Sequence, residues 1–161
     1  MFSYGESNKV RFDKAQGIIG IFAPNASGKS SLWDALSFCI YDKTSRTNSA
    51  KNILNNQKDN FYCKFNFEID GVDYFIERSA RWTRKGTNLS VNVNFWKEDA
   101  GVTTSLNGEQ RRDTNKNIER YLGKFANKLF LPYKSTNFYI LKTNVVLVLE
   151  DFLKTKTFFA N

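Results

Sequence analysis

The segment Gly17–Ser31, GIIGIFAPNASGKSS, is the most informative part of this 161-residue chain. Its first six residues are apolar and rich in Ile, which is typical of a buried strand. Pro24, Asn25 and Gly28 then predict a tight turn, and residues 31–40 predict an amphipathic helix. A strand, a tight loop and a helix in this order bind nucleotide phosphates, because backbone N–H groups and the positive end of the helix dipole face the loop.

The loop itself predicts where a nucleotide and its metal ion bind. The ammonium of Lys29 would reach the β- and γ-phosphates, and the hydroxyl of Ser30 would bind Mg²⁺, so ATP and Mg²⁺ are the expected cofactors. Ala23 and Ala26 stand where such loops often have Gly; a methyl group costs about 1 kcal/mol there unless φ is negative. A surface turn that merely reads Gly-Lys-Ser is the simpler interpretation, and the flanking strand and helix argue against it. The expected cofactor-binding residues are Asn25, Ala26, Ser27, Gly28, Lys29, Ser30 and Ser31.

The loop and the helix after it resemble a known family. Residues 23–32, followed by DALSFCIY at residues 34–41, resemble the N-terminal head segment of SMC-type ATPases. Those proteins carry a Gly-Pro-Asn-Gly-Ser-Gly-Lys-Ser loop and then a Leu-x-Asp-Ala-Leu-x-Phe helix. Within that superfamily the chain is most similar to the SbcC-like DNA-repair ATPases, which include phage recombination-endonuclease subunits.

The resemblance implies a fold and a set of partners. The fold is an α/β P-loop NTPase, the N-terminal lobe of an ABC/SMC-type head with an antiparallel β-meander beside the nucleotide-binding layer. Two such heads hold two ATP molecules between them, each site completed by the signature motif of the other head. Closure and hydrolysis then regulate a nuclease subunit at double-stranded DNA ends. The C-terminal head segment and the coiled coil of this family are expected as further partners, since this chain contains neither.

The resemblance also implies a boundary near residue 130. Residues 1–130 are expected to form the lobe, and a few residues before it are expected to be missing. Residues 131–161 depart from the family, because they have no Leu-Ser-Gly-Gly-Gln signature and no Gln follows Gln110. A truncated or frame-shifted gene is one hypothesis that explains both departures.

The composition limits the possible chemistry. The chain has 24 Lys and Arg against 16 Asp and Glu, and this charge of +8 favours a polyanionic partner. It has no His, which excludes His-based catalysis and His metal ligands. Cys39 and Cys63 stand at apolar positions and are expected to be reduced core residues of a cytoplasmic protein, at the nucleoid or in a phage-infected cell. No apolar run is long enough to cross a membrane and no signal peptide begins the chain.

Beyond the loop, the periodicity changes from helical to alternating. Asp34 is expected on the solvated face of the first helix, and residues 50–54 are expected to form a turn of helix. Thr114 is expected to cap a second helix, with Gly123 breaking it near its end. Alternation and the turns at Asp70-Gly71, 98–101 and 107–108 predict antiparallel strands over residues 61–69, 72–78, 89–96 and 102–106.

Two basic segments are candidate DNA contacts. In the first, Arg78, Arg81, Arg84 and Lys85 surround Trp82, and cations beside an aromatic ring suit phosphate contacts and base stacking. A second basic run leads into the helix after residue 110, with Lys116, Arg120 and Lys124 continuing it. A solvated charged face is the alternative interpretation of each segment. The candidate residues are Arg78, Arg81, Trp82, Arg84, Lys85, Arg111 and Arg112.

The apolar run 145–149 ends in Glu150 and Asp151, which resembles the second nucleotide motif of P-loop proteins. In that motif an Asp holds Mg²⁺ and a neighbouring Glu polarises the attacking water. The order here is reversed, so a strand ending in two solvated acids is the alternative. Two other functions stay open: a self-sufficient small NTPase or nucleotide kinase that uses these acids, and a DNA-binding module with a vestigial loop.

Overall fold

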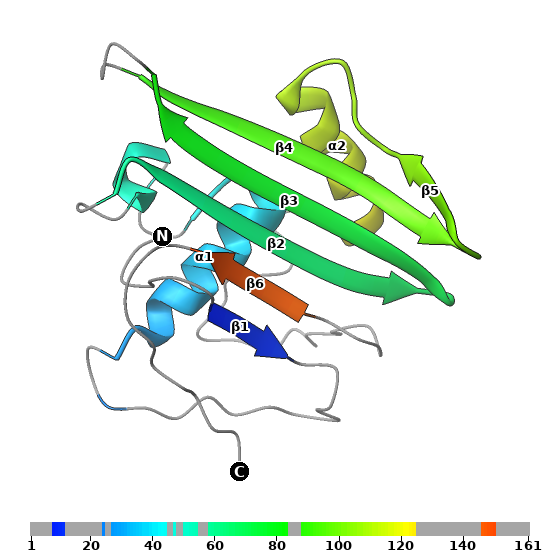
Figure 1. Ribbon diagram of the computed structural model, residues 1–161, viewed down its shortest axis with the longest axis horizontal. Helices are drawn as coiled ribbons and strands as arrows, with labels where there is room; N and C mark the ends of the chain where they lie inside the picture. Colours follow the sequence, from blue (N-terminus) through cyan, green and yellow to red (C-terminus); the bar gives the residue numbers. More distant parts are fainter. Residues whose placement is uncertain are drawn as a thin grey trace.

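The strands that the computed structural model describes form one antiparallel sheet (Figure 1). The structure describes residues 8–11, 24, 27–44, 47, 50–54, 58–83, 88–124 and 146–150. Within these residues the sheet has six strands in the order β1-β6-β2-β3-β4-β5. Their bounds are β1 Asn8–Arg11, β6 Val146–Glu150, β2 Asn60–Ile69, β3 Val72–Trp82, β4 Leu89–Asp99 and β5 Val102–Ser105.

Two hairpin turns in the described part of the chain pass through residues with positive φ. Asp70 and Gly71, at φ 53° and 78°, join β2 to β3, with Ile69 opposite Val72. Two successive residues with positive φ form the type I′ turn, whose twist matches that of the flanking strands. Ala100 and Gly101 join β4 to β5 in the same way, at φ 48° and 82°. The strands predicted at 61–69, 72–78, 89–96 and 102–106 are confirmed, and β3 and β4 run a few residues further.

Two helices lie against one face of the sheet, and the core lies between these layers (Figure 1). They are α1, Lys29–Tyr41, and α2, Arg111–Leu122; the short 3₁₀ helix η1 spans Ala50–Ile53, where a helical turn was predicted. Alternate residues of β2 are buried, from Phe61 to Phe67, as the period of two predicts. Phe38 of α1 meets Phe61 edge to face at 5.3 Å, a favourable arrangement for two aromatic rings.

The start of α2 differs from the prediction. Gln110 is the N-cap residue, and Thr114 lies inside the helix, where it is buried. The Thr114 hydroxyl accepts the N–H of Gly108 at 3.0 Å and donates to the Gln110 carbonyl. A Cβ on Gly108 would lie 2.5 Å from the Cβ of Asp113, so the loop before α2 packs closely against the helix. The Thr114 hydroxyl therefore bonds this loop and does not cap the helix. The predicted break at Gly123 is confirmed, since Gly123 ends α2 with φ 80°.

Several predicted features fall outside the described residues, namely the strand over residues 17–22 and most of the segment after residue 124.

Cys39 and Cys63 are buried free thiols, as predicted. Strand β6 lies between β1 and β2 and runs antiparallel to both. No described helix is long and apolar enough to cross a membrane.

Candidate functional site

The predicted phosphate loop leads directly into α1 in the structure. Pro24 accepts the N–H of Ser27 through its carbonyl at 3.3 Å, which closes a turn. Gly28 has φ 93° and ψ 9°, and its carbonyl accepts the N–H of Leu32, the first bond of the helix. Only Gly adopts this conformation without strain, so Gly28 turns the chain from the loop into the helix. Asn25 and Ala26 lie outside the described residues.

The backbone at the N-terminal end of α1 could donate hydrogen bonds to an anion. Its N-cap residue, Gly28, supplies no side-chain acceptor, and the first turn contains no acidic residue. The Oγ atom of Ser27 is buried and has no hydrogen-bond partner within the described part of the chain. Such a buried hydroxyl costs free energy unless something bonds to it. A helix start with no side-chain cap and a hydroxyl with no partner among the described residues therefore fit a bound phosphate group.

The three residues after Gly28 differ in what the structure shows of them. Ser30 is exposed in the first turn of α1, whereas Ser31 is buried. Lys29 begins α1, and its side chain lies outside the described part. The hydroxyl of Ser30 is an oxygen ligand of the type that Mg²⁺ prefers.

Asp34 is buried, with 1% of its surface exposed, so its predicted place on a solvated face is wrong. The prediction assumed that α1 contacts the sheet along one stripe. Every residue of α1 from Asp34 to Tyr41 is instead buried. A helix covered on all sides has no solvated face at this level, which the amphipathic pattern alone did not indicate.

Arg78 is also buried, with no exposed surface, so its predicted contact with DNA is wrong. It donates hydrogen bonds to the carbonyls of Cys39 and Ile40 at the end of α1. The sequence contains a signal for this, since Arg78 lies two residues after Ile76 and two before Ala80 on the inward side of β3. Sequence reasoning weighed its charge above its position in the strand.

The other candidate DNA contacts remain accessible where the structure describes them. Arg81 is exposed at the end of β3, and the ring of the half-buried Trp82 lies 5.6 Å from the Nζ atom of Lys51. Arg84 and Lys85 lie outside the described residues. Five exposed cations in and just after α2 form what we term the basic surface: Arg111, Arg112, Lys116, Arg120 and Lys124.

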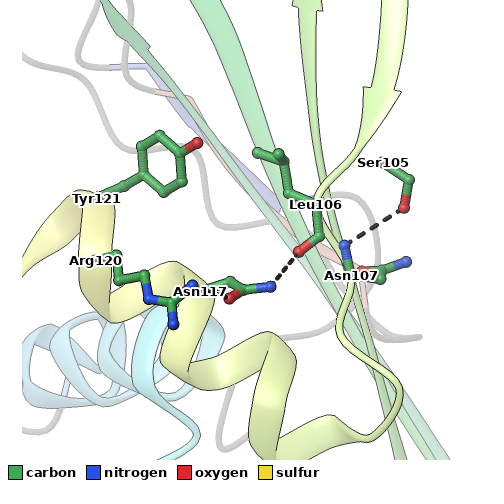
Figure 2. A pocket seen from close by; sticks show the side chains of 6 residues that line it. All are labelled: Ser105, Leu106, Asn107, Asn117, Arg120 and Tyr121. Atoms are coloured by element: carbon green, nitrogen blue, oxygen red, sulfur yellow. Dashed lines mark hydrogen bonds between the residues drawn. The ribbon is translucent and has the colours of Figure 1, made fainter.

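A groove of about 420 Å³ adjoins this surface, and sequence reasoning missed it (Figure 2). Asn117 spans it by donating to the Leu106 carbonyl at 2.9 Å, and Arg120 donates to the Asn117 Oδ1 at 3.1 Å. The groove forms because the loop after β5 returns along α2, a long-range contact with no local sequence signal. Its lining residues are Ser105, Leu106, Asn107, Asn117, Arg120 and Tyr121.

Glu150 is the last residue of β6 and lies opposite Tyr62 in the sheet register. The predicted strand before the two acids is therefore confirmed. Asp151 lies outside the described residues, and so does the side chain of Glu150. A catalytic role for these acids stays a prediction.

Comparison with known proteins identifies relatives over most of the chain. Residues 1–154 match the protein family described as the AAA domain. A protein of Acanthamoeba polyphaga mimivirus is 33% identical over 168 residues, which cover 97% of this chain and 12% of the viral protein.

Two named relatives are cellular. The SbcC component of the nuclease SbcCD from Bacillus subtilis is 29% identical over 142 residues, covering 82% of this chain and 12% of that protein. The DNA double-strand break repair Rad50 ATPase of Methanocaldococcus jannaschii is 33% identical over 86 residues, covering 53% of this chain and 8% of that protein. The chain thus spans about 12% of the length of the first two relatives.

Proposed function

The chain belongs to the AAA-domain family as an SMC/SbcC-like N-terminal segment, and from this premise we propose that it binds ATP with Mg²⁺ through Asn25–Ser31. The observation that carries the proposal is the junction between the loop and α1. There Gly28 has φ 93°, the helix N-terminus has no side-chain cap, and the Ser27 hydroxyl lacks a partner within the described residues.

Each loop residue has a distinct part in this proposal. Backbone N–H groups of Ala26 to Ser31 would donate to phosphate oxygens, and Lys29 would neutralise the β- and γ-phosphates. Ser30 would hold Mg²⁺, which supplies charge neutralisation between these phosphates. The Ser27 hydroxyl, which has no partner among the described residues, would donate to the nucleotide.

The wider role follows from the relatives. One is part of a nuclease and another is a DNA double-strand break repair ATPase. We propose that this segment supplies the phosphate loop of a head that pairs with a second head and regulates a nuclease subunit at DNA ends. Hydrolysis would then require the C-terminal head segment and the second head, so the chain by itself is expected to turn over ATP slowly.

Calorimetry with ATP and Mg²⁺ tests the nucleotide proposal. Wild type should bind, and Lys29→Ala should lose binding, because the ammonium that neutralises the phosphates is removed. Lys116→Ala is the matched control: this lysine is 56% exposed on α2, and its loss should leave ATP affinity unchanged. No binding by wild type, or equal binding by Lys29→Ala, would refute the proposal.

A second candidate function, DNA binding, is favoured by the basic surface. Its five cations are all exposed, while Asp113, Glu119 and the Asp42 carboxylate beside Arg111 supply opposing charge. Such a cluster suits non-specific contact with phosphates. Fluorescence anisotropy with a labelled DNA duplex tests this function without nucleotide.

A further inference from the structure

Arg78 holds the C-terminal end of α1, the helix that begins at the phosphate loop. Its Nε donates to the carbonyl of Cys39 at 2.6 Å, and its Nη2 donates to that of Ile40 at 3.0 Å. The last carbonyls of a helix have no partner within it and bear the negative end of its dipole. The guanidinium therefore satisfies two of these carbonyls and places a positive charge beside them.

Asp42 and Asn115 extend this contact into one network. Asp42 has φ 62° and caps α1, donating its N–H to the Phe38 carbonyl at 2.9 Å. Its Oδ2 forms an ion pair with Arg111 Nε at 2.9 Å and accepts a hydrogen bond from Asn115 Nδ2 at 3.1 Å. Asn115 in turn accepts from Arg78 Nη2 at 2.7 Å. The end of α1, strand β3 and helix α2 are thus joined by directional bonds.

Burial of this charged network costs free energy, because the charges lose their hydration. Burial lowers the pKa of Arg78, and the nearby Asp42 carboxylate opposes this. Its Nη1 has no hydrogen bond within the described part of the chain and lies 4.0 Å from Asp42 Oδ2. Apolar side chains often stabilise a core as well as a buried ion pair does. Stability alone therefore does not explain a guanidinium at this position.

Hydrogen bonds to carbonyls have a direction that apolar packing lacks, so they set the position of a helix along its axis. Helix α1 has 13 residues, which makes a rod about 20 Å long, with the phosphate loop at its other end. We propose that Arg78 is a positioning residue for nucleotide binding: it fixes α1 along its axis and thereby places the loop N–H groups for the phosphates. This inference rests on the proposed nucleotide binding.

Calorimetric ATP affinity with Mg²⁺ in Arg78→Lys and Arg78→Met tests the inference. Lysine keeps the charge but cannot donate to both carbonyls with the fixed fork of a guanidinium. Both variants should bind ATP about tenfold more weakly than wild type. Circular dichroism at the same temperature measures the folded fraction of each variant, and each affinity is calculated for the folded protein alone. Ile118→Val, which removes a buried methylene from α2 and none of these bonds, should keep the wild-type affinity.

Amide hydrogen exchange gives a readout that general destabilisation does not move. ATP should protect the amides of residues 30–33 in wild type and in Ile118→Val, and less so in Arg78→Lys. Wild-type affinity in a folded Arg78→Lys variant would overturn the inference and leave the proposed function standing. Absence of binding by wild type itself would overturn both. If Arg78→Met does not fold, Arg78→Lys decides.

Discussion

The Nε atom of Arg111 lies 2.9 Å from Oδ2 of Asp42, so the first residue of α2 forms an ion pair with the cap residue of α1. Asp42 is only 10% exposed, whereas Arg111 is 46% exposed. The carboxylate thus connects a solvent-facing cation to the interior, where Asn115 and Arg78 meet it from the other side.

Arg111→Gln should lower the free energy of unfolding by about 1 kcal/mol, because it breaks this ion pair but leaves Asp42 with Asn115. Urea denaturation measures the change. Arg112→Gln is the matched control, since Arg112 is the exposed neighbour for which the structure gives no ion pair among the described residues. Equal losses in the two variants would contradict the assignment of the effect to Asp42.

Gly28→Ala should destabilise the protein by about 1 kcal/mol and also abolish ATP binding. The first effect arises because φ 93° strains any side chain, and the second because the strained junction moves the loop. Gly101→Ala separates the two effects. Gly101 has φ 82° and open space around its Cβ position, so its variant should lose similar stability and keep ATP affinity. Urea denaturation and calorimetry measure the two quantities, and a Gly28→Ala variant that binds ATP normally would contradict the prediction.

Cys39 should make the protein less stable in alkaline solution. Burial, together with Cys63, raises the pKa of the Cys39 thiol well above its ordinary value of 9.0, so the folded state binds this proton more tightly than the unfolded state does. The resulting stability is complete below pH 9 and is lost as the pH rises through the folded pKa. Buried Tyr41 acts in the same direction.

Urea denaturation of wild type and Cys39→Ala between pH 8 and 10 measures this contribution. The free energy of unfolding should fall with pH in both proteins, and less steeply in the variant, which has no thiol to ionise at this position. Identical slopes would show that the Cys39 thiol does not contribute.

Local signals in the sequence predicted most of the secondary structure. Strict alternation predicted β2, and the Asp70-Gly71 pair predicted the hairpin that follows it. Both features depend on residues within a few positions of each other. The position of β6 between β1 and β2 had no such signal. Pairing between strands 80 or more residues apart depends on the whole topology, which local periodicity does not contain.

The candidate site was predicted less completely, and both errors concern charged residues that the fold buries. Arg78 was assigned to the surface because it is charged, although the alternation of β3 placed it on the inward side, and Asp34 because it lies off the sheet-facing stripe of α1. The burial of Arg78 is possible because the α1 carbonyls, on a distant element, accept its hydrogen bonds. A single charged residue in an apolar pattern therefore gives less information on exposure than its register does.

The basic surface predicts how DNA affinity depends on salt. Each phosphate contact contributes about −0.9 to the slope of log affinity against log salt concentration, because binding releases a condensed counterion. Arg112→Gln and Arg120→Gln should each make the slope shallower by about this amount if both side chains contact phosphates. Lys97→Gln is the control, because this lysine lies on β4, 4.0 Å from Asp99, and should leave the slope unchanged. Anisotropy titrations at several salt concentrations measure these slopes without nucleotide. Unchanged slopes in both arginine variants would mean that the basic surface is a solvated face, and DNA contact would then have to involve other cations such as Arg81.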